Sequence, residues 1–420
     1  MTPQNAMACK GSAVVKQLSV KQNMLWNTAG SMVYLVCQWL ITVFVVRLSD
    51  GYDAAGVLAL GMAVSNIFSP IGYFKVRAFQ VSDLNEEYSA GQYLAFRLLS
   101  TTVALACMIV YAAATCANDS IPAVVAYCVY SCVPIIADVY QGAAQQKNRL
   151  DVAGKDLTAR GVLSLAVFCG GMAITHSLLV SLIMMTLVTG AVVLFYLPRS
   201  LKRVIGAYSI DFAKAKMVAL FTACLPAAVA LVFAGSIPSI PRQILGAMFG
   251  ASALGAYASV ASPVVVVQMG AQYIYSPLLS SFAQCYLAKD TSGFLRLFAK
   301  VFVAIIVLAV VSFVGFAWFG EWALCLIYGD SIRDYSYLLL PLVSCTICTA
   351  FLWFLGDLLV VVRDMKGNLV CFSVAFVVCA VCSYPMLAVF GLNGASFATM
   401  AGLIAGSALC FVRLLLSMRS

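Results

Sequence analysis

Charged and amide side chains lie inside, or at the edges of, long apolar stretches of this sequence, and they are its candidates for chemistry. An ionised group in the hydrocarbon core of a bilayer costs from about 3 to well over 10 kcal/mol, so such groups usually face a protein interior or a water-filled cavity. The candidate ligand contacts are Arg47, Arg77, Arg97, Arg160, Arg242, Gln268 and Gln272. Two acids, Asp138 and Asp357, lie well within apolar runs. No constellation of residues predicts a catalytic centre.

Asp138 and Asp357 allow two interpretations. A carboxylate in a dry cavity is easily protonated and can bind H+ or Na+, which would predict cation coupling. Alternatively, each acid pairs with an interior arginine and locks helices together, with Arg77, Arg97 and Arg160 as candidate partners. Because each acid lies within about two helical turns of the expected inner surface, the structural interpretation is favoured for both.

Arg47 and Arg242 lie at equivalent edges, after the first and the seventh apolar stretch. A guanidinium binds phosphate through two parallel hydrogen bonds and keeps its charge at any relevant pH. Together the two arginines predict an anion clamp. The alternative is that each side chain reaches out to lipid headgroups. Arg242 lies in SIPSIPRQIL, where we expect prolines to break the helix and free backbone groups that suit a cavity lining.

Gln268 and Gln272 are four residues apart and so share one face of a helix. Uncharged amides on one stripe suit the hydroxyls of a sugar, but they also join helices to one another. His176, in a short turn, has no carboxylate or serine constellation near it and is expected to be exposed. The cysteines inside the apolar stretches are expected to pack as small hydrophobic residues, and no metal site is predicted.

The elements that must position these side chains are membrane-spanning helices. Of the 420 residues, 63% are hydrophobic and 10% charged, and a soluble domain of this composition would aggregate. A span needs about 20 mostly apolar residues. The charge-free stretches are 22–46, 54–74, 98–118, 120–137, 161–198, 217–241, 243–288, 301–320, 335–356 and 367–412.

These stretches predict twelve helices. The stretch 161–198 divides at 175–177, and 367–412 divides at 391–394, where glycine and asparagine favour a turn. The count requires that 243–288 holds one long span, interrupted at Pro263 and Pro277 and preceded by a short outer segment.

Basic residues fall almost entirely on one side of these helices. With the N-terminus inside the cell, every Lys and Arg except Arg47, Arg242 and Arg333 lies on the inner side. This asymmetry follows the positive-inside rule and predicts a multi-pass protein of the cell (inner) membrane with both termini in the cytoplasm. The net charge of +9 then reflects orientation, and no basic patch with interleaved aromatic residues predicts nucleic-acid binding.

Twelve helices in two sets of six predict an all-α fold with two lobes related by a pseudo-two-fold axis along the membrane normal. We expect the N-terminal lobe at 1–198, a basic cytoplasmic linker at 199–216 and the C-terminal lobe at 217–420.

A trace of this repeat remains in the sequence. Asp138 and Asp357 each precede a lysine by nine residues at the end of the fourth helix of their half. Gly56 and Gly255 likewise open the second helix of each half.

Four segments resemble the Wzx-type polysaccharide flippases, which include the O-antigen transporters of lipopolysaccharide biosynthesis. These flippases belong to the multidrug/oligosaccharidyl-lipid/polysaccharide exporter (MOP) superfamily. The segments are NMLWNTAGSMVYLVCQWLITVFVVRL, KVRAFQVSDLNEEYSAGQYLAFR, DVYQGAAQQKNRLDVAGKDLTAR and SIPRQILGAMFGASALGAYASVASPVVVVQMGAQYIYSPLLSSFAQCY. Clear motifs run from about residue 20 to 290, and topology extends the resemblance beyond. Within these segments QVSD, DVYQG-x3-QK-x-RLD and SIPR are fairly specific to one branch.

The resemblance implies a two-lobe transporter with a central cationic cavity that alternates between inward-open and outward-open states. The implied substrate is an oligosaccharide repeat unit linked to undecaprenyl pyrophosphate, moved from the cytoplasmic to the outer leaflet. By their position, the five candidate arginines are implied contacts for the pyrophosphate or the sugar. The implied partners are membrane lipids and a polysaccharide polymerase with its chain-length machinery. No cofactor is implied, although some relatives couple transport to H+ or Na+.

Three other classes of function are alternatives to a flippase: a drug exporter, a membrane enzyme and a scaffold protein. A cation-coupled multidrug exporter of the same superfamily would favour acids in its cavity, whereas this chain has more arginine than acid near its helices. A membrane polysaccharide polymerase usually carries a long outer loop, and an acyltransferase needs a histidine within a helix. The sequence predicts neither feature, so we expect no enzyme. A scaffold of the biosynthetic complex is compatible with the same sequence.

Overall fold

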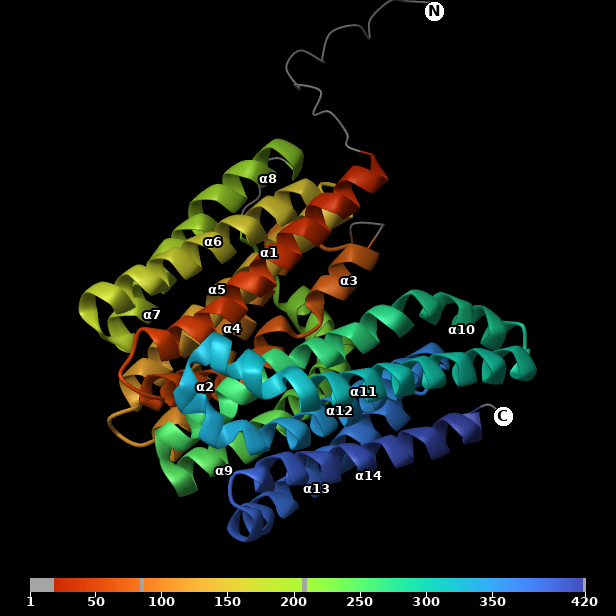
Figure 1. The fold of residues 1–420 in the computed structure, drawn as a ribbon. Helices are drawn as coiled ribbons and strands as arrows, with labels where there is room; N and C mark the ends of the chain where they lie inside the picture. The colour runs from red at the N-terminus through yellow and green to blue at the C-terminus, as the bar shows by residue number, and fades with distance from the viewer. Residues whose placement is uncertain (1–18, 84–86, 206–209, 418–420) are drawn as a thin grey trace, which may run out of the picture.

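The structure, a computed structural model, consists of helices and short connections (Figure 1). It describes residues 19–83, 87–205 and 210–417. Those ranges contain no β-strand, which confirms the all-α prediction. The two chain ends, 1–18 and 418–420, for which the sequence predicts a cytoplasmic location, lie outside the described residues.

The helices follow the order expected for two halves of six spans. The first half contains α1 (Val20–Arg47), α2 (Asp53–Tyr73), α3 (Val76–Ser82), α4 (Ala90–Thr115), α5 (Ile121–Gln146), α6 (Leu150–Thr175) and α7 (Leu178–Ala191), which continues through a π-helical turn (Val192–Tyr196) into α8 (Leu197–Ile205). The second half contains α9 (Lys214–Tyr275), a 3-10 turn (Ser276–Leu278), α10 (Leu279–Leu287), α11 (Thr291–Tyr328), a 3-10 segment (Asp330–Leu338), α12 (Leu339–Val361), α13 (Met365–Phe390) and α14 (Asn393–Ser417). α8 therefore extends the sixth span into the first part of the expected linker.

Short polar side chains fix where several helices begin. Ser19 and Ser89 each form a capping box with the glutamine three residues later, at the starts of α1 and α4. The side chains of Asp290 and Asp364 accept backbone N–H groups in the first turns of α11 and α13. These contacts satisfy donors that a helix start otherwise leaves unpaired.

α9 consists of two helices that meet at Gly250. Gly250 has φ 86° and ψ 172°, a backbone conformation that favours glycine. The apolar segment Lys214–Leu287 has 74 residues. As one straight helix it would measure about 110 Å, far more than the roughly 30 Å of a hydrocarbon core. Eleven membrane-length segments are found among the described residues, and this break raises the number of crossings to the predicted twelve.

The boundary between the seventh and eighth crossings differs from the sequence-based one. We expected the seventh span to end near 241 and a short outer segment to follow, but the helix continues to Gly250. The prediction of one span within 243–288 is confirmed, since the eighth crossing runs from the Gly250 break to Leu287. Arg242 therefore lies within a helix, about 12 Å from its end, rather than after it.

Pro241 does not break α9, contrary to the expectation from its sequence. A proline removes one N–H and leaves the carbonyl four residues earlier without its helical donor. Here that carbonyl belongs to Ile237, and Cys379 of α13 donates to it with its Sγ 3.2 Å from the oxygen. A neighbouring helix thus replaces the lost hydrogen bond, as membrane helices with internal proline require.

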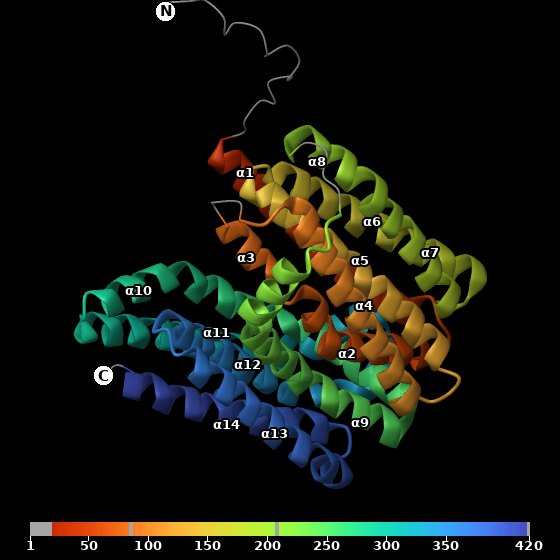
Figure 2. The ribbon, with the colours of Figure 1, turned by 180° about the vertical axis from the view of Figure 1, so that it is seen from behind.

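The helices form two lobes that meet at one end and diverge at the other, which gives the ribbon a V shape (Figures 1 and 2). We call α1–α8 the N-lobe and α9–α14 the C-lobe. The start of α1 and the end of α14 lie at the tips of the two arms. The end where the lobes meet is the closed end, and the end where they diverge is the open end.

The buried apolar clusters account for this shape. One cluster contains residues of both lobes, among them Leu58, Leu254 and Leu342, and joins them towards the closed end. A second cluster, which includes Phe354, lies within the C-lobe. A third, which includes Tyr93, lies in the N-lobe and takes in the beginning of α9. Each arm therefore has its own core, while the shared core holds the closed end together.

Two glycines allow the close crossing at the closed end. A Cβ atom on Gly56 would overlap the carbonyl oxygen of Ala251, and one on Gly255 would overlap that of Tyr52. The Tyr52 hydroxyl is also 3.0 Å from the Ser331 hydroxyl, across the two lobes. The glycines that trace the repeat in the sequence thus face each other where the lobes touch.

We expect Gly56→Val or Gly255→Val to separate the lobes at the closed end, because the added methyl groups meet backbone atoms that cannot rotate away. Overpacking costs about 1–3 kcal/mol, and about 1 kcal/mol shifts a two-state population roughly fivefold. A cysteine at position 331, in a chain without its native cysteines, should therefore react about fivefold faster with a membrane-impermeant maleimide. Gly315→Val is the matched control, since no atom lies near its Cβ position. Equal reaction rates in all variants would contradict the role of the crossing.

Candidate functional site

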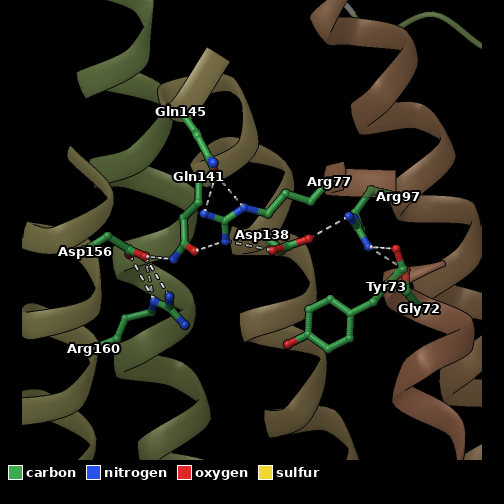
Figure 3. Close-up of polar contacts among 9 residues, drawn as sticks. All are labelled: Gly72, Tyr73, Arg77, Arg97, Asp138, Gln141, Gln145, Asp156 and Arg160. Carbon is green, nitrogen blue, oxygen red and sulfur yellow. Dashed lines mark hydrogen bonds and ion pairs between the residues drawn. The ribbon is translucent and has the colours of Figure 1, made fainter. Parts of the chain in front are cut away.

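The N-lobe charge network is a buried set of ion pairs and hydrogen bonds that joins α3, α4, α5 and α6. It consists of Arg77, Arg97, Asp138, Gln141, Gln145, Asp156 and Arg160 (Figure 3). At its centre, Asp138 Oδ2 is 2.8 Å from Arg97 Nη2, and Asp138 Oδ1 is 3.2 Å from Arg77 Nη1. The structure thus places Asp138 in the interior pairing that the sequence allowed, with two of the three partners considered.

Arg97 is the most deeply buried charge of the network. Its side chain has 0% exposure, and its Nη1 donates to the carbonyl oxygens of Gly72 and Tyr73 at 2.8 and 2.6 Å. Those carbonyls are available because α2 ends there: the next residue, Phe74, has a left-handed backbone with φ 45°. Asp138 and the end of α2 together replace the water that this guanidinium would otherwise need.

Arg160 pairs with Asp156, an acid that the sequence analysis did not select. The two side chains lie four residues apart on α6 and approach to 2.7 Å, and both are almost wholly buried. The signal was present as an acid and an arginine at i and i+4, a spacing that places them on one helix face. Asp156 does not stand out in the sequence because it lies among other charged residues, between 147 and 160, rather than beside a long apolar stretch.

Gln141 connects the two halves of the network. Its amide nitrogen donates to Asp156 at 2.9 Å, and its amide oxygen accepts from Arg77 at 3.1 Å. Arg77 also donates to Gln145, and its side chain is 31% exposed. Arg77 is therefore the side of the network that solvent can reach, whereas Arg97 and Arg160 are enclosed.

The QVSD motif provides a second polar anchor, between α3 and α4. The Asp83 carboxylate accepts hydrogen bonds from the backbone of Glu87 and Tyr88 and from the hydroxyl of Tyr93. Burial favours the protonated acid, but these three donors outweigh it and hold the pKa of Asp83 below its usual range. Gln146, from the DVYQG motif, donates to the Asp83 carbonyl at 2.8 Å. Two segments that carry the family resemblance therefore contact each other.

Arg47 holds the closed end rather than lining a cavity. Its Nε and Nη2 donate to the carbonyl oxygens of Ile327 and Leu326, both at 2.7 Å. These are among the last carbonyls of α11, where a helix end carries partial negative charge. Arg47 is not among the residues that line either cavity described below, so the structure does not bring it into one site with Arg242.

A central cavity of about 420 Å³ lies between the lobes and is lined by α2, α9, α12, α13 and α14. Arg242 lines this cavity from α9. Among the described residues, no carboxylate lines the cavity, and the Arg242 guanidinium has neither an ion pair nor a hydrogen-bond acceptor. Arg242 is therefore the candidate arginine whose charge remains free to bind a ligand.

A second, larger space adjoins the first. We call it the apolar groove; its volume is about 780 Å³, and it runs between α1 and the second half of α9. Its wall is mainly hydrophobic, with Met32, Leu35 and Val266 among the lining residues that are strongly exposed on the surface of the chain. Arg242 lines this groove as well as the central cavity. The central cavity, whose lining includes amides and hydroxyls, and the apolar groove thus share one cation.

The glutamines, the second acid and the histidine considered in the sequence analysis lie at separate places in the structure. Gln268 lines the central cavity, whereas Gln272, one turn further along α9, is exposed and lines neither space. Asp357 accepts a hydrogen bond from Tyr275 of α9 and has no ion-pair partner in the part of the chain that the structure describes. His176 is the exposed last-turn cap of α6, as the sequence predicts.

Comparison with solved structures identifies known proteins that share this fold. No family model matches the chain. It is similar over 94% of its length to a multidrug resistance MATE family transporter of the MOP superfamily in the inward-facing conformation, with a TM-score of 0.72, 11% sequence identity and 98% of that chain covered. It is also similar to a MOP superfamily transporter from Pyrococcus furiosus whose binding pocket has reversed polarity, with a TM-score of 0.63, 11% identity, and 96% and 97% of the two chains covered.

The chain has the fold of the MATE transporters. Its sequence is 21% identical, over 324 residues, to the capsular polysaccharide biosynthesis protein CapF of Staphylococcus aureus, covering 76% of this chain and 80% of CapF. The resemblance to polysaccharide exporters inferred from the sequence agrees with this fold and with the similarity to CapF. The protein is a multi-pass membrane protein with two lobes.

Within this MATE fold, the two lobes give contrasting predictions for their equivalent acids. We expect Asp138→Asn to lower the free energy of unfolding by about 3–5 kcal/mol, because it leaves the buried charge of Arg97 without a counter-ion. The melting temperature of the purified protein in detergent measures this. Asp357→Asn is the matched control, since Asp357 has no arginine partner among the described residues, and it should cost less than about 1 kcal/mol. Equal losses in the two variants would show that the ion pair of Asp138 does not stabilise the lobe.

Proposed function

We propose that this protein is a flippase that moves an oligosaccharide linked to undecaprenyl pyrophosphate from the cytoplasmic to the outer leaflet, for surface polysaccharide biosynthesis. The observation that carries the proposal is Arg242, which has no ion-pair partner in the part of the chain that the structure describes and lines both the central cavity and the apolar groove. A lipid-linked oligosaccharide has three parts of different chemistry: a sugar chain, a pyrophosphate and a hydrocarbon tail. The central cavity matches the sugar chain, the shared guanidinium matches the pyrophosphate, and the apolar groove matches the tail.

The pyrophosphate would bind Arg242. A guanidinium binds phosphate oxygens through two parallel charge-assisted hydrogen bonds, and in a cavity of low dielectric these are stronger than in water. The tail would lie in the apolar groove, whose hydrophobic wall continues to the exposed surface of α1. The headgroup could then cross the membrane within protein while the tail stays among lipids.

The assignment of the pyrophosphate to Arg242 is supported by the other arginines, which already have protein partners. Arg97 and Arg160 hold buried carboxylates, and Arg47 holds the end of α11. A multidrug exporter for cations would need acids in its cavity, whereas no carboxylate lines the central cavity among the described residues. The similarity to CapF, a capsular polysaccharide biosynthesis protein, supports the same substrate class.

The orientation completes the proposal. α3, α8 and α10 lie towards the open end (Figures 1 and 2), and the segments around them carry the basic residues that the positive-inside rule places in the cytoplasm. In this orientation the cavity opens inward and is closed outward by the Gly56–Gly255 crossing. The conversion to an outward-open state would require that crossing to separate while the arms close.

We expect Arg242→Gln to abolish surface polysaccharide in cells of the native host that lack the chromosomal gene, while the variant still inserts into the membrane. The loss of charge-assisted hydrogen bonds costs about 1.5–3 kcal/mol, or roughly a 10- to 100-fold loss of affinity. Lipid-linked oligosaccharide should therefore accumulate in the cytoplasmic leaflet. Arg333→Gln, an exposed arginine paired with Glu321, is the control for charge and should behave as wild type.

Normal surface polysaccharide from Arg242→Gln would remove this residue from the site. If deletion of the gene leaves the lipid-linked pool unchanged but increases the retention of dyes or drugs, the multidrug-exporter function replaces the flippase.

We also propose that Asp357 couples transport to H+ or Na+. It is a half-buried acid without an ion-pair partner among the described residues, and Lys75 of the N-lobe is the basic group whose charge acts on it. A carboxylate in such a position can exchange a proton or a sodium ion as the lobes move.

In proteoliposomes, Asp357→Asn should make the flipping rate independent of an imposed pH or Na+ gradient, because an amide exchanges neither ion. Asp119→Asn, at an exposed position between α4 and α5, should keep the dependence of the wild type. A variant at position 357 that is slower but retains the gradient dependence would assign Asp357 a structural role.

A further inference from the structure

One face of α12 forms a polar and aromatic wall of the central cavity. None of the candidate arginines and glutamines lies on this wall. Thr346, Thr349 and Trp353 all line the cavity. They are spaced by three and four residues, so they form one stripe along the helix. All three side chains are half-buried although α12 is otherwise strongly apolar.

The two threonines present acceptors to the cavity. Thr346 Oγ1 donates to the Leu342 carbonyl at 2.7 Å, and Thr349 Oγ1 donates to the Cys345 carbonyl at 2.9 Å. Each hydroxyl proton is therefore used within the helix. The lone pairs of each oxygen remain available to accept hydrogen bonds from a ligand.

Trp353 is held in place by its neighbour in the same wall. Its ring packs edge-to-face on Phe372 of α13, with ring centroids 6.3 Å apart and planes at 77°, and Phe372 also lines the cavity. A fixed indole ring offers a large apolar surface at little cost in conformational entropy. The C–H face of a sugar ring is a ligand of matching shape and polarity.

Amides complete the cavity from the other helices. Asn66 of α2 is exposed and Gln268 of α9 is half-buried, and both line the same space. An amide both donates and accepts, so it can pair with a hydroxyl in either sense. The cavity thus combines hydroxyl acceptors, amides, aromatic rings and the cation of Arg242, with no carboxylate among its described lining residues.

We propose that the stripe Thr346–Thr349–Trp353, facing Asn66 and Gln268, is the subsite that binds the sugar residues next to the pyrophosphate. This inference rests on the proposed flippase function and assigns its specificity to α12. A site built to hydrogen-bond hydroxyl groups discriminates strongly against a ligand that lacks them. The stripe would therefore select lipids that carry a neutral or anionic sugar over bare undecaprenyl pyrophosphate.

The test compares two lipids on the purified full-length protein in lipid nanodiscs. One is undecaprenyl pyrophosphate; the other is the lipid-linked oligosaccharide that accumulates in cells lacking this gene. Wild type should bind the second at least tenfold more tightly. Trp353→Leu, and the nearly isosteric pair Thr346→Val with Thr349→Val, should remove most of that tenfold difference and leave the affinity for undecaprenyl pyrophosphate unchanged. Trp318→Leu, on a tryptophan that is 78% exposed on α11, is the matched control.

The outcomes separate this inference from the function on which it rests. If wild type binds both lipids equally, or if the stripe variants weaken both equally, the sugar subsite is overturned and the flippase function stands. If Arg242→Gln weakens both lipids while the stripe variants weaken only the sugar-bearing one, the subsite is supported. If wild type binds neither lipid, the flippase function itself fails. Trp353→Phe, which keeps a ring, should retain most of the selectivity and guards against misfolding of the leucine variant.

Discussion

A guanidinium inside a membrane protein needs a carboxylate, backbone carbonyls, a ligand or the water of a cavity, because hydrocarbon offers no hydrogen-bond acceptor. This constraint sorts the arginines of the chain. Arg97 and Arg160 take carboxylates, and Arg47 takes the carbonyls at the end of α11. Arg242 alone among the candidates has no such partner within the described residues, and it lies where two cavities join. A buried ion pair is by itself weak evidence for a gain in stability. Here its consequence is that the paired arginine does not present a free charge to the cavity.

The two lobes share a topology but use it differently. At the fourth span of the N-lobe, Asp138 is neutralised by two arginines and ties α3, α4 and α5 into one unit. At the equivalent place in the C-lobe, Asp357 meets Tyr275 beside a cluster of aromatic rings that includes Phe354. A lobe with a buried charge network beside its apolar core thus faces a lobe held mainly by apolar packing. Movement between them would leave the ion pairs of the N-lobe intact.

The shared core and the Gly56–Gly255 crossing make the closed end the natural pivot of this movement. Backbone contact without intervening side chains allows helices to cross closely, which is a common solution where lipid offers no hydrophobic drive to association. The same contact can separate without breaking ion pairs, since it is formed by glycine and carbonyl groups. The cation of Arg242 lies between this crossing and the open end, where a ligand that entered from one side would have to pass.

The sequence by itself determined the membrane class, the twelve crossings and their division into two halves, because length, hydropathy and the positions of basic residues are properties of the chain alone. It also singled out Arg97, Arg160 and Asp138, which the structure joins in one charge network, although Asp156 was overlooked. Only the tertiary structure decided which arginine pairs with which acid, because those partners lie on different helices. It also decided that Pro241 leaves α9 unbroken, since the thiol of Cys379, on another helix, donates to the Ile237 carbonyl in place of the N–H that proline lacks. The position of Arg242 in a cavity, and the presence of the α12 stripe in the lining of the same cavity, depend on how the helices pack, which the local sequence does not reveal.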